Sequence, residues 1–219
     1  MTNNFSLDEF FFEIVKSSVQ FSTSEELKKA INLLFETWEK SGTVFTMGCG
    51  GSASTATHFA ADLAKTVMVD DKKGLKTISL VDNIPLVSAW TNDKGWGNVF
   101  SGQLDQWITA NDVLVGFSVH GGSGEGEAGT WSENLVRAMK LARERKAKII
   151  GFAGFDGGAM KKMADVCLIV PINSEFYGTP VVEAFHVVLH HGIIFRLKNM
   201  IKNHPKVKKD ESRKNKTKS

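Results

Sequence analysis

A glycine-rich segment, followed closely by a histidine, opens the middle part of the chain. Gly48-Cys49-Gly50-Gly51-Ser52 leads directly into residues that favour a helix and that include His58. Glycines let the backbone approach a ligand closely, and the free amides at the start of a helix attract an anion such as phosphate. We therefore expect Gly50, Gly51 and Ser52 to contribute to a phosphate site.

The same segment also fits a nucleotide motif. The spacing Gly48-x-Gly50-x-x-Ala53 satisfies the dinucleotide fingerprint, and Asp82 ends the next expected strand, where a ribose-binding acid would lie. That pattern is weak on its own. A nucleoside triphosphate loop is excluded, because the Gly-Lys-Ser or Gly-Lys-Thr ending of such loops is missing.

A second glycine-rich segment, residues 118–132, also joins an expected strand to an expected helix. It carries Ser118, His120 and Ser123 among its glycines, so it too offers hydroxyl groups and free amides. Two such loops at one sheet edge suit a compact ligand with many oxygen atoms better than a dinucleotide, whose pyrophosphate needs only one loop. A sugar phosphate fits that description.

Acid and base candidates lie on two expected helices. His58 and Asp62 are four residues apart and so share one helix face, as they would also do in a simple ion pair near a helix end. On the last helix, Glu183 and His190 lie on one stripe together with His186, whereas His191 points roughly 80° away from Glu183. Helical geometry alone therefore favours His190 over His191, and at least one of these histidines is expected to be a buried structural residue.

Alternating strands and helices are expected to position these groups. Two capping-box spacings, Ser6 to Glu9 and Thr23 to Glu26, predict a pair of amphipathic helices within residues 1–40. Short apolar runs predict the strands, and a helical pattern predicts the last helix at 179–202; the expected strands are 43–47, 76–80, 112–118, 148–153 and 166–170. The predicted fold class is α/β, a three-layer, doubly wound, parallel five-stranded sheet preceded by the N-terminal helical pair. Ligands of such sheets bind beyond the carboxyl ends of the strands.

Composition places the chain among globular proteins. It has 219 residues, 42% hydrophobic and 23% charged, with only two cysteines and therefore no disulfide framework or cysteine-based zinc site. No stretch is apolar enough to span a membrane, and the start lacks the pattern of a signal peptide, so we expect a cytoplasmic protein. We expect one domain over residues 1–202.

The charge of the chain is concentrated at its end. Residues 203–219 hold seven Lys or Arg against two acidic residues, a net charge of +5, which leaves −2 for the rest because the whole chain is +3. We expect this segment to be a disordered basic tail. Since the rest has no basic stripe and the tail has no aromatic residue to stack on bases, nucleic-acid binding is not expected.

Taken in order, these motifs resemble the SIS (sugar isomerase) domain proteins and, among them, the phosphoheptose isomerases, which interconvert sedoheptulose 7-phosphate and a heptose 7-phosphate. The resemblance extends from about residue 5 to residue 200. Its motifs are the Gly-Gly-Ser loop with its helix, Asn92-Asp93-x-Gly95, the Ser118 strand end, Asp156-Gly157-Gly158, Ala164-Asp165, and Glu183-x-x-His186 with His191. The order is specific, although no single piece is.

The resemblance implies roles for individual residues. Ser52 and Ser118 look like phosphate-binding serines, and Asn92 and Asp93 like the pair that reaches the sugar hydroxyls. In the family, two histidines, a glutamate and a glutamine form the active site. The histidine positions are occupied here by His58 and His191, the glutamate position by Asp62 and the glutamine position by Glu183. It also implies a homo-oligomer, most often a tetramer, whose neighbouring subunits complete the site, and some members bind zinc.

Four departures from the family pattern bear on the chemistry. Cys49 replaces an asparagine, Asp62 replaces a glutamate, Glu183 replaces a glutamine, and the second loop is longer than usual, which leaves open which serine holds phosphate. With two carboxylates and two neutral histidines, His58, Asp62, Glu183 and His191 would make a tetrahedral zinc set, although roughly 12 Å of helix separates Glu183 from His191. The resemblance favours His191, and the helix stripe favours His190.

The expected function is a ketose–aldose isomerase acting on a sugar phosphate, with Asp62 or Glu183 as base and His191 as acid, or with zinc polarising the carbonyl. The alternative is a phosphosugar-binding regulator that keeps the fold without turnover. Oxidoreduction with a nucleotide cofactor is a distant third.

Overall fold

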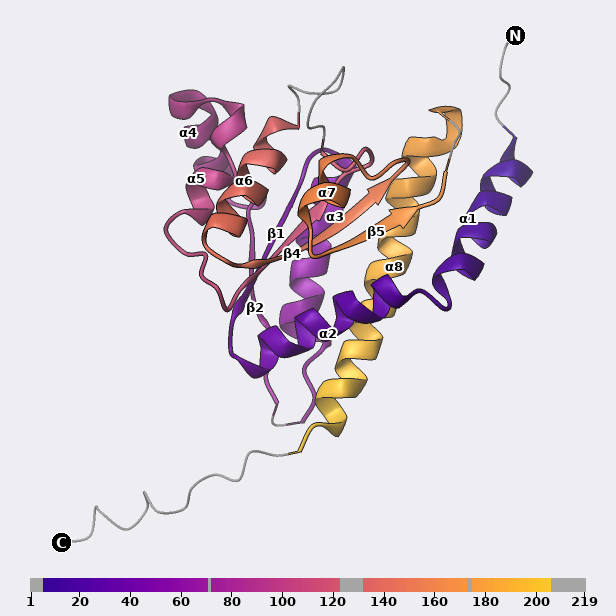
Figure 1. The fold of residues 1–219 in the computed structure, drawn as a ribbon, viewed down its shortest axis with the longest axis horizontal. Coiled ribbons are helices and arrows are strands. Elements are labelled where there is room, and N and C mark those ends of the chain that lie inside the picture. The colour runs from indigo at the N-terminus through magenta and orange to yellow at the C-terminus, as the bar shows by residue number, and fades with distance from the viewer. Residues whose placement is uncertain (1–5, 71, 123–131, 173–174, 206–219) are drawn as a thin grey trace, which may run out of the picture.

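Five parallel strands form a single sheet in the residues that the computed structural model describes, which are 6–70, 72–122, 132–172 and 175–205 (Figure 1). The strand order is β2-β1-β3-β4-β5. The strands are β1 (Thr43–Gly48), β2 (Lys76–Ser79), β3 (Val113–Phe117), β4 (Lys148–Gly154) and β5 (Val166–Val170). Each begins and ends within one residue of its predicted bounds, and the predicted fold class is confirmed.

The order in which strands are added to the sheet changes side between β1 and β3. It runs from β1 outward to β2 and then returns to the other side of β1 to form β3. The register pairs Gly48 with Phe117, so the two glycine-rich loops leave the sheet side by side. Such a switch point is where doubly wound sheets bind their ligands.

Helices cover both faces of the sheet. On one face, α2 (Glu25–Glu39), α3 (Gly51–Ala61) and α8 (Glu175–Asn203) pack on an apolar core; on the other lie α5 (Ser101–Leu104), α6 (Glu133–Glu144) and α7 (Gly158–Met163). Successive strand residues such as Val44 and Phe45 are both buried, one in each core. This is the pattern expected of a parallel sheet between two helical layers.

The N-terminal helical pair consists of α1 (Leu7–Phe21) and α2. The Ser6 hydroxyl accepts a hydrogen bond from the Glu9 amide, as predicted for the first cap. The predicted second cap, Thr23, is wrong by one residue: Ser24 is the last extended residue, and its hydroxyl accepts from the Leu27 amide at 3.1 Å. Capping follows the residue at which the backbone turns helical, and neighbouring Thr and Ser offer the same hydroxyl.

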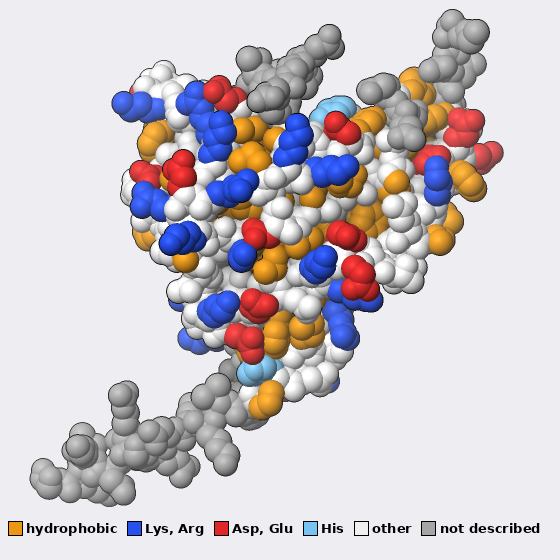
Figure 2. Space-filling model, viewed as in Figure 1, with side chains coloured by type: hydrophobic (Ala, Val, Ile, Leu, Met, Phe, Trp, Pro, Cys, Tyr) orange, Lys and Arg blue, Asp and Glu red, His pale blue; other side chains and the backbone are white. Residues whose placement is uncertain are grey.

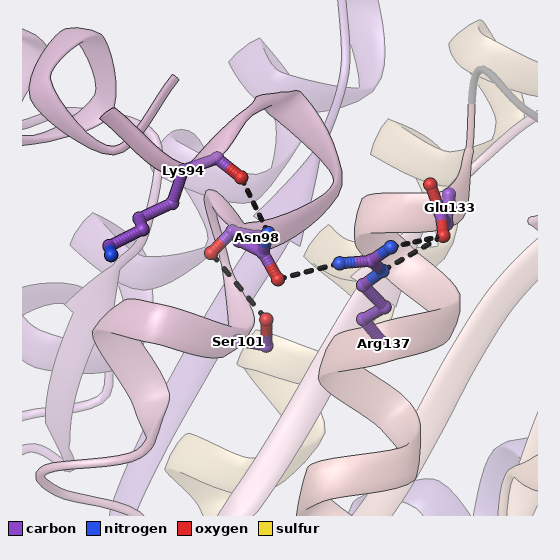
Figure 3. A network of polar contacts seen from close by, with 5 residues as sticks. All are labelled: Lys94, Asn98, Ser101, Glu133 and Arg137. Atoms are coloured by element: carbon purple, nitrogen blue, oxygen red, sulfur yellow. Dashed lines mark hydrogen bonds and ion pairs between the residues drawn. The ribbon is translucent and has the colours of Figure 1, made fainter. Parts of the chain in front are cut away.

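A polar network ties the segment after β2 to α6 (Figure 3). This segment contains α4 (Ile84–Lys94) and the short helix η2 (Trp96–Asn98). Arg137 of α6 donates to the Asn98 side chain at 2.7 Å and to Glu133, while the Asn98 amide donates to the Lys94 carbonyl. The network therefore fixes the carboxyl end of α4, although α4 itself has no buried residue.

The surface shows mixed charges and one exposed apolar helix face. Lys and Arg side chains alternate with Asp and Glu over the face shown in Figure 2, where hydrophobic side chains are also visible on α1. The exposed apolar residues of α1 are Leu7, Phe11, Phe12, Val15 and Val19. They lie within an arc of roughly 140° of the helix, so α1 presents one apolar face to solvent.

The end of the chain is described only to residue 205. Asn203 ends α8, which begins at Glu175, four residues before its predicted start. The predicted tail therefore lies outside the described residues from position 206 onward, and the single domain over residues 1–202 stays a prediction. In the described ranges, no helix is long and apolar enough to cross a membrane.

Candidate functional site

Three histidines surround Asp62 on the face between α3 and α8. The Asp62 Oδ2 atom lies 3.1 Å from His190 Nε2, 3.5 Å from His58 Nε2 and 3.7 Å from His191 Nε2. One potential ligand atom from each of these four side chains lies within 4.8 Å of the others. We call His58, Asp62, His190 and His191 the Asp62 cluster.

A π-helical turn positions the carboxylate of this cluster. The turn η1 (Asp62–Thr66) follows α3 without a break, and the Val67 amide donates to the Asp62 carbonyl. The Thr66 hydroxyl donates to Asp62 Oδ1 at 2.7 Å, so this oxygen is held independently of Oδ2. Such turns are frequent at functional sites, yet neither the turn nor the role of Thr66 was predicted from the sequence. The four-residue spacing of Asp62 and Thr66 was the sequence feature that could have indicated their hydrogen bond.

Burial separates the histidines into two kinds. The His190 side chain is fully buried, whereas those of His58 and His191 are 50% and 44% exposed. An incoming ligand therefore meets His58 and His191 first. The sequence analysis posed His190 and His191 as alternatives, but the fold brings both next to Asp62.

The protonation states in the cluster follow from its contacts. Burial raises the pKa of Asp62, but hydrogen bonds from Thr66 and His190, together with the nearby histidines, outweigh it and hold that pKa below its usual value. Burial lowers the pKa of His190 to about 4, and the Asp62 hydrogen bond offsets only part of this effect. At neutral pH, Asp62 is therefore ionised and His190 is neutral.

Glu183 is not part of the Asp62 cluster. A Cβ atom on Gly51 would lie 2.5 Å from both Glu183 carboxylate oxygens, so this carboxylate packs against the first turn of α3. His58 lies two turns further along α3, about 10 Å away along the axis. The step of seven positions from Glu183 to His190 on α8 produces a similar axial separation, so the Glu183 carboxylate lies apart from the Asp62 cluster.

The first glycine loop leaves space at the start of α3. Gly50 has a φ of 59°, which favours glycine, and no atom lies within 4 Å of the position that a Cβ would take. Ser52 is buried in the first turn of α3. Cys49 accepts a hydrogen bond from the buried Asn134 amide at 3.3 Å, and burial raises the pKa of its thiol. Cys49 is therefore a neutral packing group rather than a nucleophile.

The second loop is built around Ser118. Its hydroxyl accepts a hydrogen bond from the Gly122 amide at 3.1 Å, and both Gly121 and Gly122 have positive φ angles. His120 is exposed and stacks on Phe155, with ring centroids 4.6 Å apart. Ser123, the other serine predicted to bind phosphate, lies outside the described residues.

Asn92 and Asp93 lie on the exposed helix α4. The Asn92 amide donates to the Asp93 carboxylate at 2.8 Å. Within the described residues, no hydrogen bond or ion pair joins either of them to the Asp62 cluster or to the glycine loops. The fold of one chain therefore leaves this pair apart from the other predicted site residues.

Comparisons with known proteins agree with this architecture. The model of the SIS domain family matches residues 11–154. The lincomycin biosynthesis protein LmbN of Streptomyces lincolnensis is 47% identical over 161 residues, which cover 74% of this chain but only 58% of LmbN. A phosphoheptose isomerase of Helicobacter pylori is 36% identical over 193 residues, covering 87% of this chain and 93% of that protein.

A solved structure supports the same family assignment. The phosphoheptose isomerase GmhA from Neisseria gonorrhoeae superposes with a TM-score of 0.75 at 28% sequence identity, covering 88% of this chain and 97% of that chain. The predicted family resemblance is thereby confirmed over the greater part of the sequence.

Proposed function

Because the chain belongs to the SIS domain family, we propose that it is a sugar-phosphate isomerase, which interconverts a ketose phosphate and an aldose phosphate. The relatives named phosphoheptose isomerase support sedoheptulose 7-phosphate as the first substrate to test. The similarity to LmbN supports a related sugar phosphate as the second. The observation that carries the proposal is the ionised Asp62 among three histidines, since isomerisation needs a base and an acid close together.

The proposed reaction moves one proton between neighbouring carbons. Asp62 removes the proton from the carbon beside the carbonyl and returns it to the adjacent carbon, because it is ionised and held by two hydrogen bonds. His191, partly exposed beside Asp62, donates a proton to the carbonyl oxygen and takes back the proton of the neighbouring hydroxyl group as that group becomes the new carbonyl. Glu183, the other predicted base, lies against Gly51, so we assign it to contacts with the substrate rather than to proton transfer.

The donor set of the Asp62 cluster also fits a zinc ion. Imidazole nitrogens and a carboxylate oxygen are ligands that zinc takes in catalytic sites. His58, Asp62 and His191 would hold the ion, which when bound would polarise the substrate carbonyl. The predicted fourth ligand, Glu183, is not among the four side chains of the Asp62 cluster in the single chain, because its carboxylate lies against Gly51.

Phosphate binding is proposed for the paired loops at the switch point. Gly50, Gly51 and Ser52 offer free amides at the start of α3, but the Glu183 carboxylate lies at the same helix start and would repel an anion. The second loop has no such carboxylate among its described contacts, so we propose that Ser118 at the carboxyl end of β3 contributes to phosphate binding. Ser52 and Glu183 then face the sugar.

A homo-oligomer, most simply a tetramer, is proposed from two exposed helix surfaces. One is the apolar face of α1, and the other is α4, which has no buried residue and carries Asn92 and Asp93. A neighbouring subunit could bring such an α4 to the partly exposed side of the Asp62 cluster. The cytoplasmic location stays a prediction.

The proposal is tested by incubating the purified protein with sedoheptulose 7-phosphate and following aldose formation by NMR. Wild type should convert the substrate, and Asp62→Asn should lower kcat by at least about 100-fold, since general base catalysis contributes 10²–10⁴-fold. Bound sugar phosphate without turnover would instead support the regulator, the second candidate, which the replacement of the family glutamate by Asp62 favours.

A further inference from the structure

His190 differs from the other two histidines of the Asp62 cluster in both burial and bonding. It is the fully buried one, and its Nε2 lies within hydrogen-bond distance of Asp62 Oδ2, at 3.1 Å. The longer Asp62 distances of His58 and His191, and their exposure, leave those two rings facing solvent. His190 therefore lies behind the carboxylate, as seen from solvent.

The chemistry of the two partners fixes the tautomer of His190. A carboxylate oxygen accepts hydrogen bonds, so the ring nitrogen that lies 3.1 Å from Asp62 Oδ2, Nε2, carries the proton. The other ring nitrogen, Nδ1, is buried without a hydrogen-bond partner in the described part of the chain. With its proton directed at Asp62, Nε2 has no lone pair left to bind a metal or to accept a proton.

Both oxygens of Asp62 are thus held by donors on different elements. Thr66 in η1 holds Oδ1, and His190 in α8 holds Oδ2. An aspartate has a shorter side chain than the glutamate it replaces, so the position of its carboxylate depends directly on these two contacts.

We propose that His190 is a positioning residue, whose Nε2–H donates to Asp62 and directs the carboxylate toward the space between His58 and His191. His190 itself neither transfers a proton to substrate nor binds a metal. The inference rests on the proposed function, because it takes Asp62 as the group that reacts. It assigns the reactive contacts to His58, Asp62 and His191.

Two variants at one position test this role. His190→Phe keeps an aromatic ring of similar size but removes the donor, whereas His190→Gln retains an amide that can donate to the same oxygen. Loss of a partner that orients an active-site group typically lowers activity by about 10–100-fold. We expect His190→Phe to lower kcat by this factor at nearly constant KM, and His190→Gln to recover most of the loss.

His186 supplies the matched control. It is also fully buried on α8, one turn before His190, but its Nε2 lies 3.3 Å from the Ala153 carbonyl, and no hydrogen bond joins it to Asp62 within the described residues. His186→Phe should leave kcat within a few-fold of wild type. If His190→Phe retains full kcat, or if His190→Gln is as impaired as His190→Phe, the positioning role is wrong.

A spectroscopic measurement separates this inference from the proposed function. In protein labelled with ¹⁵N-histidine, the His190 resonances should report the neutral Nε2–H tautomer at pH 7, and Asp62→Ala should shift them. A protonated Nδ1 would overturn the inference even in an active enzyme. If the wild-type protein turns over no sugar phosphate, the proposed function fails, while the tautomer still decides whether His190 donates to Asp62.

Discussion

At the scale of residues, the proposed chemistry depends on Asp62 and the three histidines around it. The sequence predicted His58, Asp62 and His191 as neighbours, and the fold brings these three together. The sequence did not distinguish His190 from His191. Helix geometry gives the directions of side chains around α8, but it does not give the rotation of α8 relative to α3. The π turn was not recognised either, since the helix ends at Thr66, too soon after the extra residue for a shifted apolar pattern to be seen.

Buried histidines on α8 should make the protein sensitive to mild acid. Burial lowers the pKa of His186 to about 4 from 6.5, so the folded state resists a proton that the unfolded chain accepts. Stability is therefore fully present above about pH 6.5 and falls as the pH drops from there toward 4. Urea unfolding between pH 7 and 4.5 should show a smaller decline for His186→Phe than for wild type. Parallel curves for the two proteins would contradict the assignment.

At the scale of elements, the sequence predicted the strands well and the helix ends less well. Short apolar runs bounded by glycine or polar residues defined each strand, and burial in two cores explains why the runs are continuous. The second N-terminal helix begins after Ser24 instead of Thr23, because both residues carry a suitable hydroxyl and only the backbone angles distinguish them. The position of the Glu183 carboxylate against Gly51 depends on how α8 packs on α3, and no local sequence pattern predicts that packing.

The two glycine loops should differ in their tolerance of alanine. Gly50 and Gly121 both have φ angles unfavourable for other residues, which costs about 1–3 kcal/mol for alanine. At Gly50 the added Cβ meets open space, but at Gly121 it would lie 2.0 Å from the Gly157 carbonyl oxygen. Overpacking adds about 1–3 kcal/mol more, so Gly121→Ala should lower the free energy of unfolding more than Gly50→Ala. Equal losses in urea denaturation would show that the second loop relaxes without resistance.

At the scale of the whole molecule, the family and the parallel sheet were predictable because the motifs occur in a fixed order along the chain. The relation of Asn92 and Asp93 to the site was not predictable from one chain, since α4 has no buried residue and packs on the core only through partly buried side chains such as Val87 and Trp90. This is the part of the site that the proposed neighbouring subunits would complete.

Replacing apolar residues of α1 should dissociate the proposed oligomer. Phe12 and Val19 are 65% and 69% exposed in the single chain, so glutamate at both positions leaves the core of the chain intact but opposes burial of this face. The variant should have a lower mass than wild type in light scattering at micromolar concentration, with an unchanged far-UV spectrum. A monomeric wild-type protein would contradict the proposal, as would an unchanged mass of the variant.

The most direct test of the central claim is the isomerisation of sedoheptulose 7-phosphate in deuterated water. If Asp62 carries a proton between neighbouring carbons, it can exchange that proton with solvent while the intermediate is bound. We predict that wild type forms an aldose phosphate with deuterium at C2, and that Asp62→Asn forms almost none. Full turnover by Asp62→Asn, with the same labelling at C2 as in wild type, would contradict proton transfer by Asp62.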